Sequence, residues 1–328
     1  MNKVLNVAKD NPIEEKSGAF RNVRWRSLAI VLPFLVVFIA VSVGSPSFLT
    51  PINLLNILDQ QSSILIIAAA GTIVLITGGI DLSVGATFAL AAVVSGTVAL
   101  TNGPVLGLIS GLVVGGIVGL INGVVSTILK INALIATLAM SFIALGVASL
   151  VTGGNLIVLF EHPEFGAIAK TKILGVQSAI WIMILVVVVL GLVLARTTLG
   201  RYWYAAGGNA EAARLVGIQV SWVRILAFVL SGMAAGLGGV LDTSRVLSAQ
   251  ASAGTALTFT VLAGIVVGGT SILGGEGAIW RTVVGVLFIA LIGNGFNLIG
   301  VDALFQQITL GLILLIAVGI DAWSRQRR

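Results

Sequence analysis

One acidic residue stands alone in the longest uncharged part of the sequence. Asp81 lies in the stretch Thr77-Gly-Gly-Ile-Asp-Leu-Ser-Val-Gly-Ala86, and no other charged residue occurs between Asp59 and Lys130. An ionised carboxylate in a hydrocarbon environment costs several kcal/mol, so it must be capped, paired or functional. The chain around it is therefore expected to supply polar partners or a polar cavity.

Two roles for Asp81 remain open. In the structural role, Gly78 and Gly79 end one helix, and Asp81 or Ser83 caps the next helix by accepting its free N–H groups. In the functional role, the same break exposes backbone N–H groups and a positive helix end to a cavity, which suits a hydroxylated or anionic solute. Capping is the simpler of the two interpretations.

A similar pattern recurs late in the chain. Residues 73–86 run as apolar span, paired glycines, acid, glycine and apolar span; residues 265–278 do likewise around Glu276. Gly-interrupted spans at corresponding places in two halves indicate a transport site. The residues expected to form a translocation path or gate are Thr77, Gly78, Gly79, Asp81, Ser83, Gly268, Gly269 and Asn294.

A polar segment at 196–224 forms the second constellation. Gly207-Gly208-Asn209 is typical of a turn and an N-cap, and residues 210–216 are expected to form a short Ala-rich helix that Gly217 ends. Glu211 and Arg214 are spaced i, i+3 and support that helix. Such a helix is either an ordinary surface helix or one that docks into a partner's groove.

Composition indicates which elements must position these residues. Of the 328 residues, 58% are hydrophobic and 9% are charged, with 41 glycines and a mean hydropathy of +1.13. Soluble domains carry about 25% charged residues. The continuous apolar runs predict an all-α polytopic membrane protein rather than a β-barrel.

Several function classes are disfavoured. The net charge of +6 comes from chain ends and short loops, without a basic patch carrying interleaved aromatics, so nucleic acid is not an expected partner. No Gly-x-x-x-x-Gly-Lys-[Ser/Thr] loop is present, the chain has no Cys, and its single histidine is His162. We therefore expect no enzyme activity, no metal site and no cofactor in this chain.

The hydropathy pattern predicts about ten transmembrane helices with both termini cytoplasmic. The expected domains are a cytoplasmic tail at 1–26, a transmembrane domain at 27–320 and a basic tail at 321–328; a cleaved signal peptide is the alternative for the first span. With this topology only Lys170, Lys172 and Arg245 of 18 basic residues lie outside. The expected spans are 27–43, 62–80, 82–101, 105–129, 133–152, 179–195, 225–241, 259–273, 282–300 and 303–320, and 44–61 is expected to be an outside loop.

Four ordered motifs resemble those of one family across residues 30–320. The chain is similar to the permease subunit of bacterial ABC importers for monosaccharides, the ribose/xylose/arabinose/galactose branch. The matching motifs are Gly78-Gly-Ile-Asp-Leu-Ser-Val-Gly85; Asn122-Gly123 with Ile131-Asn-Ala-Leu-Ile-Ala-Thr-Leu138; Gly207-Gly-Asn-Ala-Glu-Ala-Ala213 with Gly217-Ile218; and Gly268-Gly-Thr-Ser-Ile-Leu-Gly-Gly275.

The resemblance implies a multi-pass protein of the bacterial inner membrane that imports a pentose or hexose by alternating access. It also implies a second permease copy, a cytoplasmic ATP-binding subunit that hydrolyses ATP, and a periplasmic sugar-binding protein. A permease for branched-chain amino acids or nucleosides is the main alternative, and an ion-coupled secondary transporter a weaker one. The helix that would couple to the ATPase comprises Gly208, Asn209, Glu211, Ala212, Ala213, Arg214 and Gly217.

Overall fold

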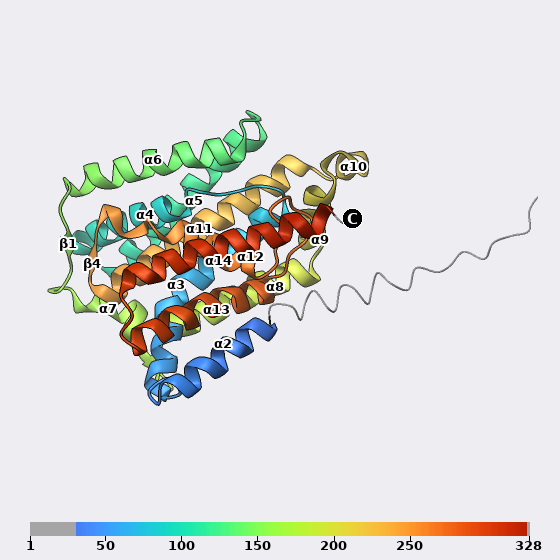
Figure 1. The fold of residues 1–328 in the computed structure, drawn as a ribbon. Coiled ribbons are helices and arrows are strands. Elements are labelled where there is room, and N and C mark those ends of the chain that lie inside the picture. Colours follow the sequence, from blue (N-terminus) through green and yellow to red (C-terminus); the bar gives the residue numbers. More distant parts are fainter. Residues whose placement is uncertain (1–30, 327–328) are drawn as a thin grey trace, which may run out of the picture.

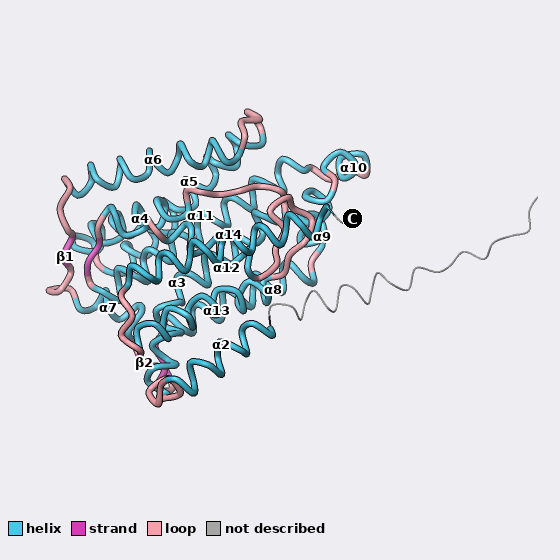
Figure 2. Tube along the Cα trace, viewed as in Figure 1, coloured by secondary structure: helices cyan, strands magenta, loops and turns pink. Residues whose placement is uncertain are grey.

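Long apolar runs fold into long helices here, because a helix satisfies its own backbone hydrogen bonds where no water is present. The computed structural model describes residues 31–326, and these form a bundle of helices with two short β pairings (Figures 1 and 2). The expected tail at 1–26 and the last two residues lie outside the described part. The tail's Arg325-Gln326 belongs to the end of the last helix.

The elements follow one another in this order: α2 (Val31–Gly44), α3 (Pro51–Ile76), α4 (Val84–Asn102), α5 (Pro104–Thr127), α6 (Ala133–Thr152), β1 (Ile157–Val158), α7 (Pro163–Lys170), β2 (Lys172–Ile173), β3 (Val176–Gln177), α8 (Ser178–Arg196), α9 (Thr198–Gly208), α10 (Ala210–Leu215), α11 (Val220–Val246), β4 (Ser248–Ala249), the 3₁₀ turn η1 (Ala251–Gly254), α12 (Leu257–Val267), α13 (Ile279–Leu298) and α14 (Ala303–Gln326). β1 pairs antiparallel with β4, and β2 with β3.

Seven of the described helices are long and apolar enough to cross a membrane: α3, α4, α5, α6, α8, α11 and α13. Shorter apolar helical stretches lie at 31–44, 251–267 and 304–316. Each of the ten expected spans overlaps one of these ten helical regions, although 62–80 and 259–273 are shifted relative to the helical stretches at 51–76 and 251–267. The described residues therefore have the architecture of a polytopic helical membrane protein.

The centre of the bundle is built from α3, α4 and α11. Every residue of α3 from Leu65 to Ile76 is buried. Glycines let α11 lie directly against α5: a methyl group at Gly115 would collide with the Gly232 carbonyl, and one at Gly236 with the Gly111 carbonyl. The Gly-x-x-x-Gly spacings are thus packing positions, as close helix approach requires.

Three connecting segments differ from the sequence-based expectation. The expected outside loop at 44–61 is helical from Pro51 onward. A proline fits the first helical position because its missing N–H is not needed there, and Thr50 caps the helix. The loop after α6 contains α7 and three short strands. Gly207 and Gly208 belong to α9 rather than to a turn, so the expected turn is wrong and the helix runs on to Asn209.

The two ends of the bundle have different character. Figure 1 shows α9 and α10 at one end, where α2 begins and α14 ends, and the pair β1–β4 with α7 at the other. The first and last described helices therefore meet the same end of the bundle as the short helix α10.

Candidate functional site

The site begins where α3 ends. Ile76 is the last residue of α3 and Thr77 is its C-cap; Gly78 follows with φ of +78°, the left-handed geometry that glycine adopts without strain. The Gly78 N–H donates to Leu75 O at 2.9 Å and the Gly79 N–H to Val74 O at 3.1 Å. These two bonds form a Schellman ending, so the predicted role of the glycines in ending the helix is confirmed.

Asp81 follows this ending and is almost completely buried, with 4% of its surface exposed. One carboxylate oxygen accepts from the Ser83 N–H at 3.0 Å and the Ser83 hydroxyl at 2.7 Å; the other accepts from the Ser231 hydroxyl at 2.9 Å. The Asn122 amide donates to the Ser83 hydroxyl at 2.8 Å. Both oxygens of the isolated acid therefore have partners within the chain.

Other helices hold the backbone beyond Asp81. The Thr137 hydroxyl of α6 accepts from the Leu82 N–H at 3.0 Å, and the Thr258 hydroxyl of α12 accepts from the Gly85 N–H at 3.0 Å. With Asn122 from α5 and Ser231 from α11, side chains from four helices bind the segment between α3 and α4. We call Asp81, Ser83, Asn122 and Ser231 the Asp81 cluster.

The second break repeats the ending but not the acid. After α12, Gly269 has φ of +80°, its N–H donates to Val266 O at 2.8 Å, and the Thr270 N–H donates to Ile265 O at 3.2 Å. This is again a Schellman ending. Glu276, however, is exposed and lies in the loop before α13. The expected similarity of the two stretches is therefore confirmed for the glycine helix endings, but the second stretch has no buried acid.

Helix α9 contacts both breaks. Gly207 lies so close to the Ile76 carbonyl that any side chain would collide with it, and the same carbonyl accepts from the Gly275 N–H at 2.9 Å. The Tyr204 hydroxyl donates to Gly277 O at 2.8 Å, and burial raises the pKa of this hydroxyl, which keeps its proton. Gly207 is therefore a contact residue, a role that its expected place in a turn did not suggest.

The short helix α10 has the expected caps. The Asn209 side chain accepts from the Glu211 and Ala212 N–H groups at 3.0 and 2.9 Å, and Gly217 ends the helix with φ of +87°. Glu211 and Arg214 are exposed, whereas Ala213 is buried against the bundle. The predicted N-cap and C-terminal glycine are confirmed.

Asn294 lies in a different place from the other expected path residues. It lines a cavity of about 370 Å³ between α3, α12, α13 and α14, and it exchanges amide hydrogen bonds with Asn53 at 2.9 and 3.1 Å. None of the residues of either glycine break lines this cavity. The structure thus brings Thr77, Gly78, Gly79, Asp81 and Ser83 together in one break, Gly268 and Gly269 in a second, and Asn294 in a separate cavity.

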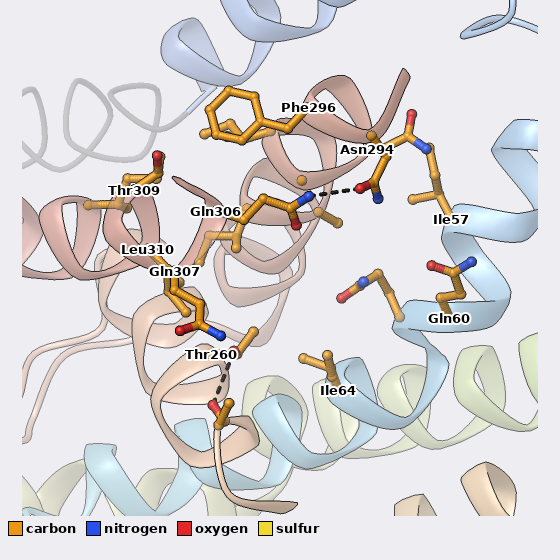
Figure 3. A pocket seen from close by; sticks show the side chains of 18 residues that line it. Ile57, Gln60, Ile64, Thr260, Asn294, Phe296, Gln306, Gln307, Thr309 and Leu310 are labelled. Atoms are coloured by element: carbon orange, nitrogen blue, oxygen red, sulfur yellow. Dashed lines mark hydrogen bonds between the residues drawn. The ribbon is translucent and has the colours of Figure 1, made fainter. Parts of the chain in front are cut away.

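Neutral amide side chains dominate the polar lining of this cavity, which we call the amide pocket (Figure 3). Gln306 donates to Asn297 at 2.7 Å, and Gln307 lies beside Thr260. All residues that line it are uncharged. Primary amides donate and accept in fixed directions, so they can bind hydroxyl groups without attracting an ion. The polar lining residues are Gln60, Gln61, Thr260, Asn294, Asn297, Gln306, Gln307 and Thr309.

Sequence reasoning missed most of these partners. Ser231 lies 150 positions from Asp81 in the sequence. The one available signal was that it directly precedes Gly232, which belongs to the closely packed glycine face of α11. Gln306 and Gln307 form a pair of amides near the start of an apolar helix, a signal that could have been noticed.

Fold and site together define a helical membrane transport protein: a bundle with glycine breaks, a buried polar cluster and an uncharged polar pocket. A family model described as "Branched-chain amino acid transport system / permease component" matches residues 53–318, and the chain belongs to this family. It is a permease subunit of a bacterial inner membrane and not an enzyme. Permeases of this family act with an ATP-binding subunit and a substrate-binding protein.

Individual relatives cover nearly the whole chain. The ribose import permease protein of Bacillus subtilis (strain 168) is 42% identical over 88% of this chain and 91% of its own length. The ribose import permease protein of Escherichia coli (strain K12) is 38% identical over 89% and 92%. The L-arabinose transport system permease protein of the same strain is 36% identical over 93% of both chains. No solved structure matches.

Proposed function

We propose that this chain is the permease subunit of an ATP-driven importer that carries a monosaccharide, a pentose or hexose, across the bacterial inner membrane by alternating access. The observation that carries this proposal is the similarity, at 36–42% identity over about nine tenths of the chain, to permeases named for ribose and L-arabinose. The uncharged amide pocket supports it independently.

The pocket lining favours a sugar over a branched-chain amino acid. A zwitterionic amino acid carries a carboxylate and an ammonium group, and a site that removes them from water must supply opposite charges or several strong hydrogen bonds. No Asp, Glu, Lys or Arg lines the amide pocket. A sugar presents only neutral hydroxyl groups, which Gln and Asn side chains bind well.

The proposed topology has ten spans within residues 27–320 and both termini in the cytoplasm. In support, the connection between α5 and α6, the end of α8, and α10 lie at the same end of the bundle as α9 (Figure 1). These segments carry Lys130, Arg196 and Arg214, and positive charge favours the cytoplasmic side. The amide pocket is built from the beginning of α3 and the end of α13, so in this orientation it faces the outer half of the membrane.

In this proposal α10, which carries Ala212, Ala213 and Arg214, docks on the ATP-binding subunit, with Gly208, Asn209 and Gly217 shaping the helix and the exposed side chain of Glu211 facing the partner. Its motion would reach both glycine breaks through α9, because Gly207 contacts Ile76 and Tyr204 bonds to Gly277. The breaks, including Thr77, Asp81, Ser83, Gly268 and Gly269, would then act as the gate. ATP would bind to the partner and not to this chain.

The working assembly would contain a second permease copy, a cytoplasmic ATP-binding subunit and a periplasmic binding protein that delivers the sugar. Such a protein selects the sugar before the permease meets it. The amide pocket would receive the sugar from the outer side, and a rearrangement at the breaks would release it inward.

Reconstitution tests the proposal directly. The full chain, the ATP-binding subunit and the binding protein are placed in vesicles, and uptake of labelled ribose, arabinose and leucine is measured with and without ATP. We expect ATP-dependent uptake of a sugar but not of leucine. Uptake of leucine alone, or sugar uptake by this chain without the ATP-binding subunit under an ion gradient, would contradict it.

A further inference from the structure

A second cavity, of about 440 Å³, lies at the end of the bundle that carries α10. Three basic side chains line it: Lys130 between α5 and α6, Arg214 on α10 and Arg224 on α11. Among the described residues that line it, none is Asp or Glu. We call this cavity the basic pocket; it shares no lining residue with the amide pocket.

The three positive charges have no counter-ion within residues 31–326. Arg224 donates only to backbone carbonyls, to Thr77 O at 3.0 Å and to Ala206 O at 3.3 Å, and no described carboxylate pairs with Lys130 or Arg214. Like charges around one partly enclosed cavity repel one another, and an anion bound between them relieves that repulsion.

The beginning of α6 adds to the positive potential. Ile131, Asn132 and Ala133 line the pocket, so the N-terminal end of this 20-residue helix borders it. The Asn132 side chain caps only the Leu134 N–H, at 2.9 Å. A helix N-terminus carries a partial positive charge and favours phosphate groups.

Exposed apolar side chains adjoin the lining residues along the chain. Ile128 and Leu129 at the end of α5 are 57% and 61% exposed, and Ile135 on α6 is 61% exposed. A basic pocket between membrane helices with an apolar border matches an anionic phospholipid, whose phosphate enters the pocket while its acyl chains lie along the helices.

We propose that the basic pocket binds a phosphate group, supplied by the headgroup of an anionic phospholipid of the inner leaflet. The choice of leaflet rests on the proposed topology, which places this end in the cytoplasm. A bound headgroup would also contact Gly78 and Gly79, which line the same pocket, and so would bear on the first glycine break.

Lipid retention by the purified full-length chain tests the site. The chain is extracted in neutral detergent, and native mass spectrometry measures the retention of phosphatidylglycerol against phosphatidylcholine. Inorganic phosphate is added in a separate arm. The test variants are Lys130→Asn and Arg214→Gln, alone and combined; Asn suits the left-handed backbone of position 130, where φ is 56°. Arg224 is left intact because it holds two backbone carbonyls.

The matched control is Arg196→Gln, an exposed residue in the last turn of α8 that does not line the pocket. We expect the control to retain phosphatidylglycerol like the unchanged chain, and the double variant to lose retention about tenfold or more. Circular dichroism and gel filtration confirm that each variant is folded.

The remaining outcomes separate the sources of the anion. If inorganic phosphate displaces bound phosphatidylglycerol, the pocket is a phosphate site. If the chain retains inorganic phosphate but prefers neither lipid, the ligand is a soluble phosphate and the lipid source is overturned. Equal loss in the control and the double variant overturns the site. Unchanged lipid retention with weaker binding of the ATP-binding subunit would instead make the pocket a protein contact. Sugar uptake is scored separately, so failure of the lipid site and failure of the transport function are distinguishable.

Discussion

The Asp81 cluster and the amide pocket are both polar regions inside an apolar bundle, but they are built differently. In the cluster, both carboxylate oxygens of Asp81 have donors, and Thr137 and Thr258 from two further helices bind the backbone beside it. In the pocket, amides line an open cavity of about 370 Å³. We interpret the charged residue as structural, because both of its oxygens are already bonded, and we propose that the neutral amides meet a solute.

This comparison predicts two kinds of variant. Substitutions in the Asp81 cluster should lower the stability of the protein together with its transport. Substitutions in the amide pocket should lower the apparent affinity for sugar and leave stability unchanged.

The largest expected effect is that of Asp81→Ala. The variant leaves the Ser83 N–H and the Ser83 and Ser231 hydroxyls without their acceptor, at about 1–3 kcal/mol for each buried donor. We expect thermal unfolding of the purified chain to shift strongly downward and sugar uptake to be lost. An Ala variant with the melting temperature of the unchanged chain would show that the Asp81 cluster does not stabilise the protein.

Asp81→Asn sharpens the same point. Its amide oxygen can still accept from Ser83, so the loss of stability should be smaller than for Ala. A fully active Asn variant would show that the negative charge is not essential and that a neutral acceptor at position 81 suffices.

Gln307→Leu should act on transport alone. It keeps the size of the side chain and removes hydrogen-bonding groups from the pocket wall, so we expect the half-saturating sugar concentration to rise roughly threefold to tenfold. The control is Gln219→Leu, the same exchange at an exposed position outside the pocket. A shifted melting temperature with unchanged uptake would assign Gln307 to structure.

Glu211→Lys should separate transport from folding at the other end of the bundle. The residue is exposed on α10, so its charge reversal should leave stability intact and lower sugar-stimulated ATP hydrolysis several-fold. Glu161→Lys, exposed before α7 at the opposite end, serves as the control. Equal ATP hydrolysis by the ATP-binding subunit in complex with the unchanged chain and with the Glu211 variant would remove the docking role of this residue.

Much of the helical framework follows from local sequence. The Schellman endings at Gly78 and Gly217 were predictable because only glycine adopts left-handed geometry cheaply, and the cap at Asn209 because its short side chain reaches the first free N–H groups. The beginning of α3 was missed because Pro51 was interpreted as a loop signal, although it also fits the first position of a helix.

The partners within the site depend on tertiary packing and could not be predicted in the same way. Ser231 of α11 meets Asp81 because α11 packs closely against α4, where a methyl group at Gly239 would collide with the Phe88 carbonyl. Likewise, Gln60 of α3 and Gln307 of α14 line one cavity because both helices pack against α12 and α13, which no local pattern specifies. Asn294 was the one pocket residue identified from the sequence.

Glu276→Gln should have the smallest effect. The echo of the Asp81 stretch suggested an equivalent acid at the second break, yet Glu276 is exposed, and changes to exposed charges usually alter stability by less than about 0.5 kcal/mol. We expect thermal unfolding and sugar uptake close to those of the unchanged chain. A loss of stability and uptake as large as that expected for Asp81→Ala would show that Glu276 has a role at the second glycine break equivalent to that of Asp81 at the first.

Cysteine accessibility can distinguish whether the amide pocket or the Asp81 cluster meets the sugar. The chain contains no cysteine of its own, so each introduced thiol is the only one in the chain. Gln307→Cys and Ser231→Cys variants are assembled with the ATP-binding subunit and treated with a water-soluble thiol reagent, with and without sugar. We expect the reagent to modify the thiol at position 307 and sugar to protect it, whereas the buried thiol at position 231 should stay unmodified. Rapid modification and sugar protection at position 231, with none at position 307, would contradict it and make the Asp81 cluster the sugar site.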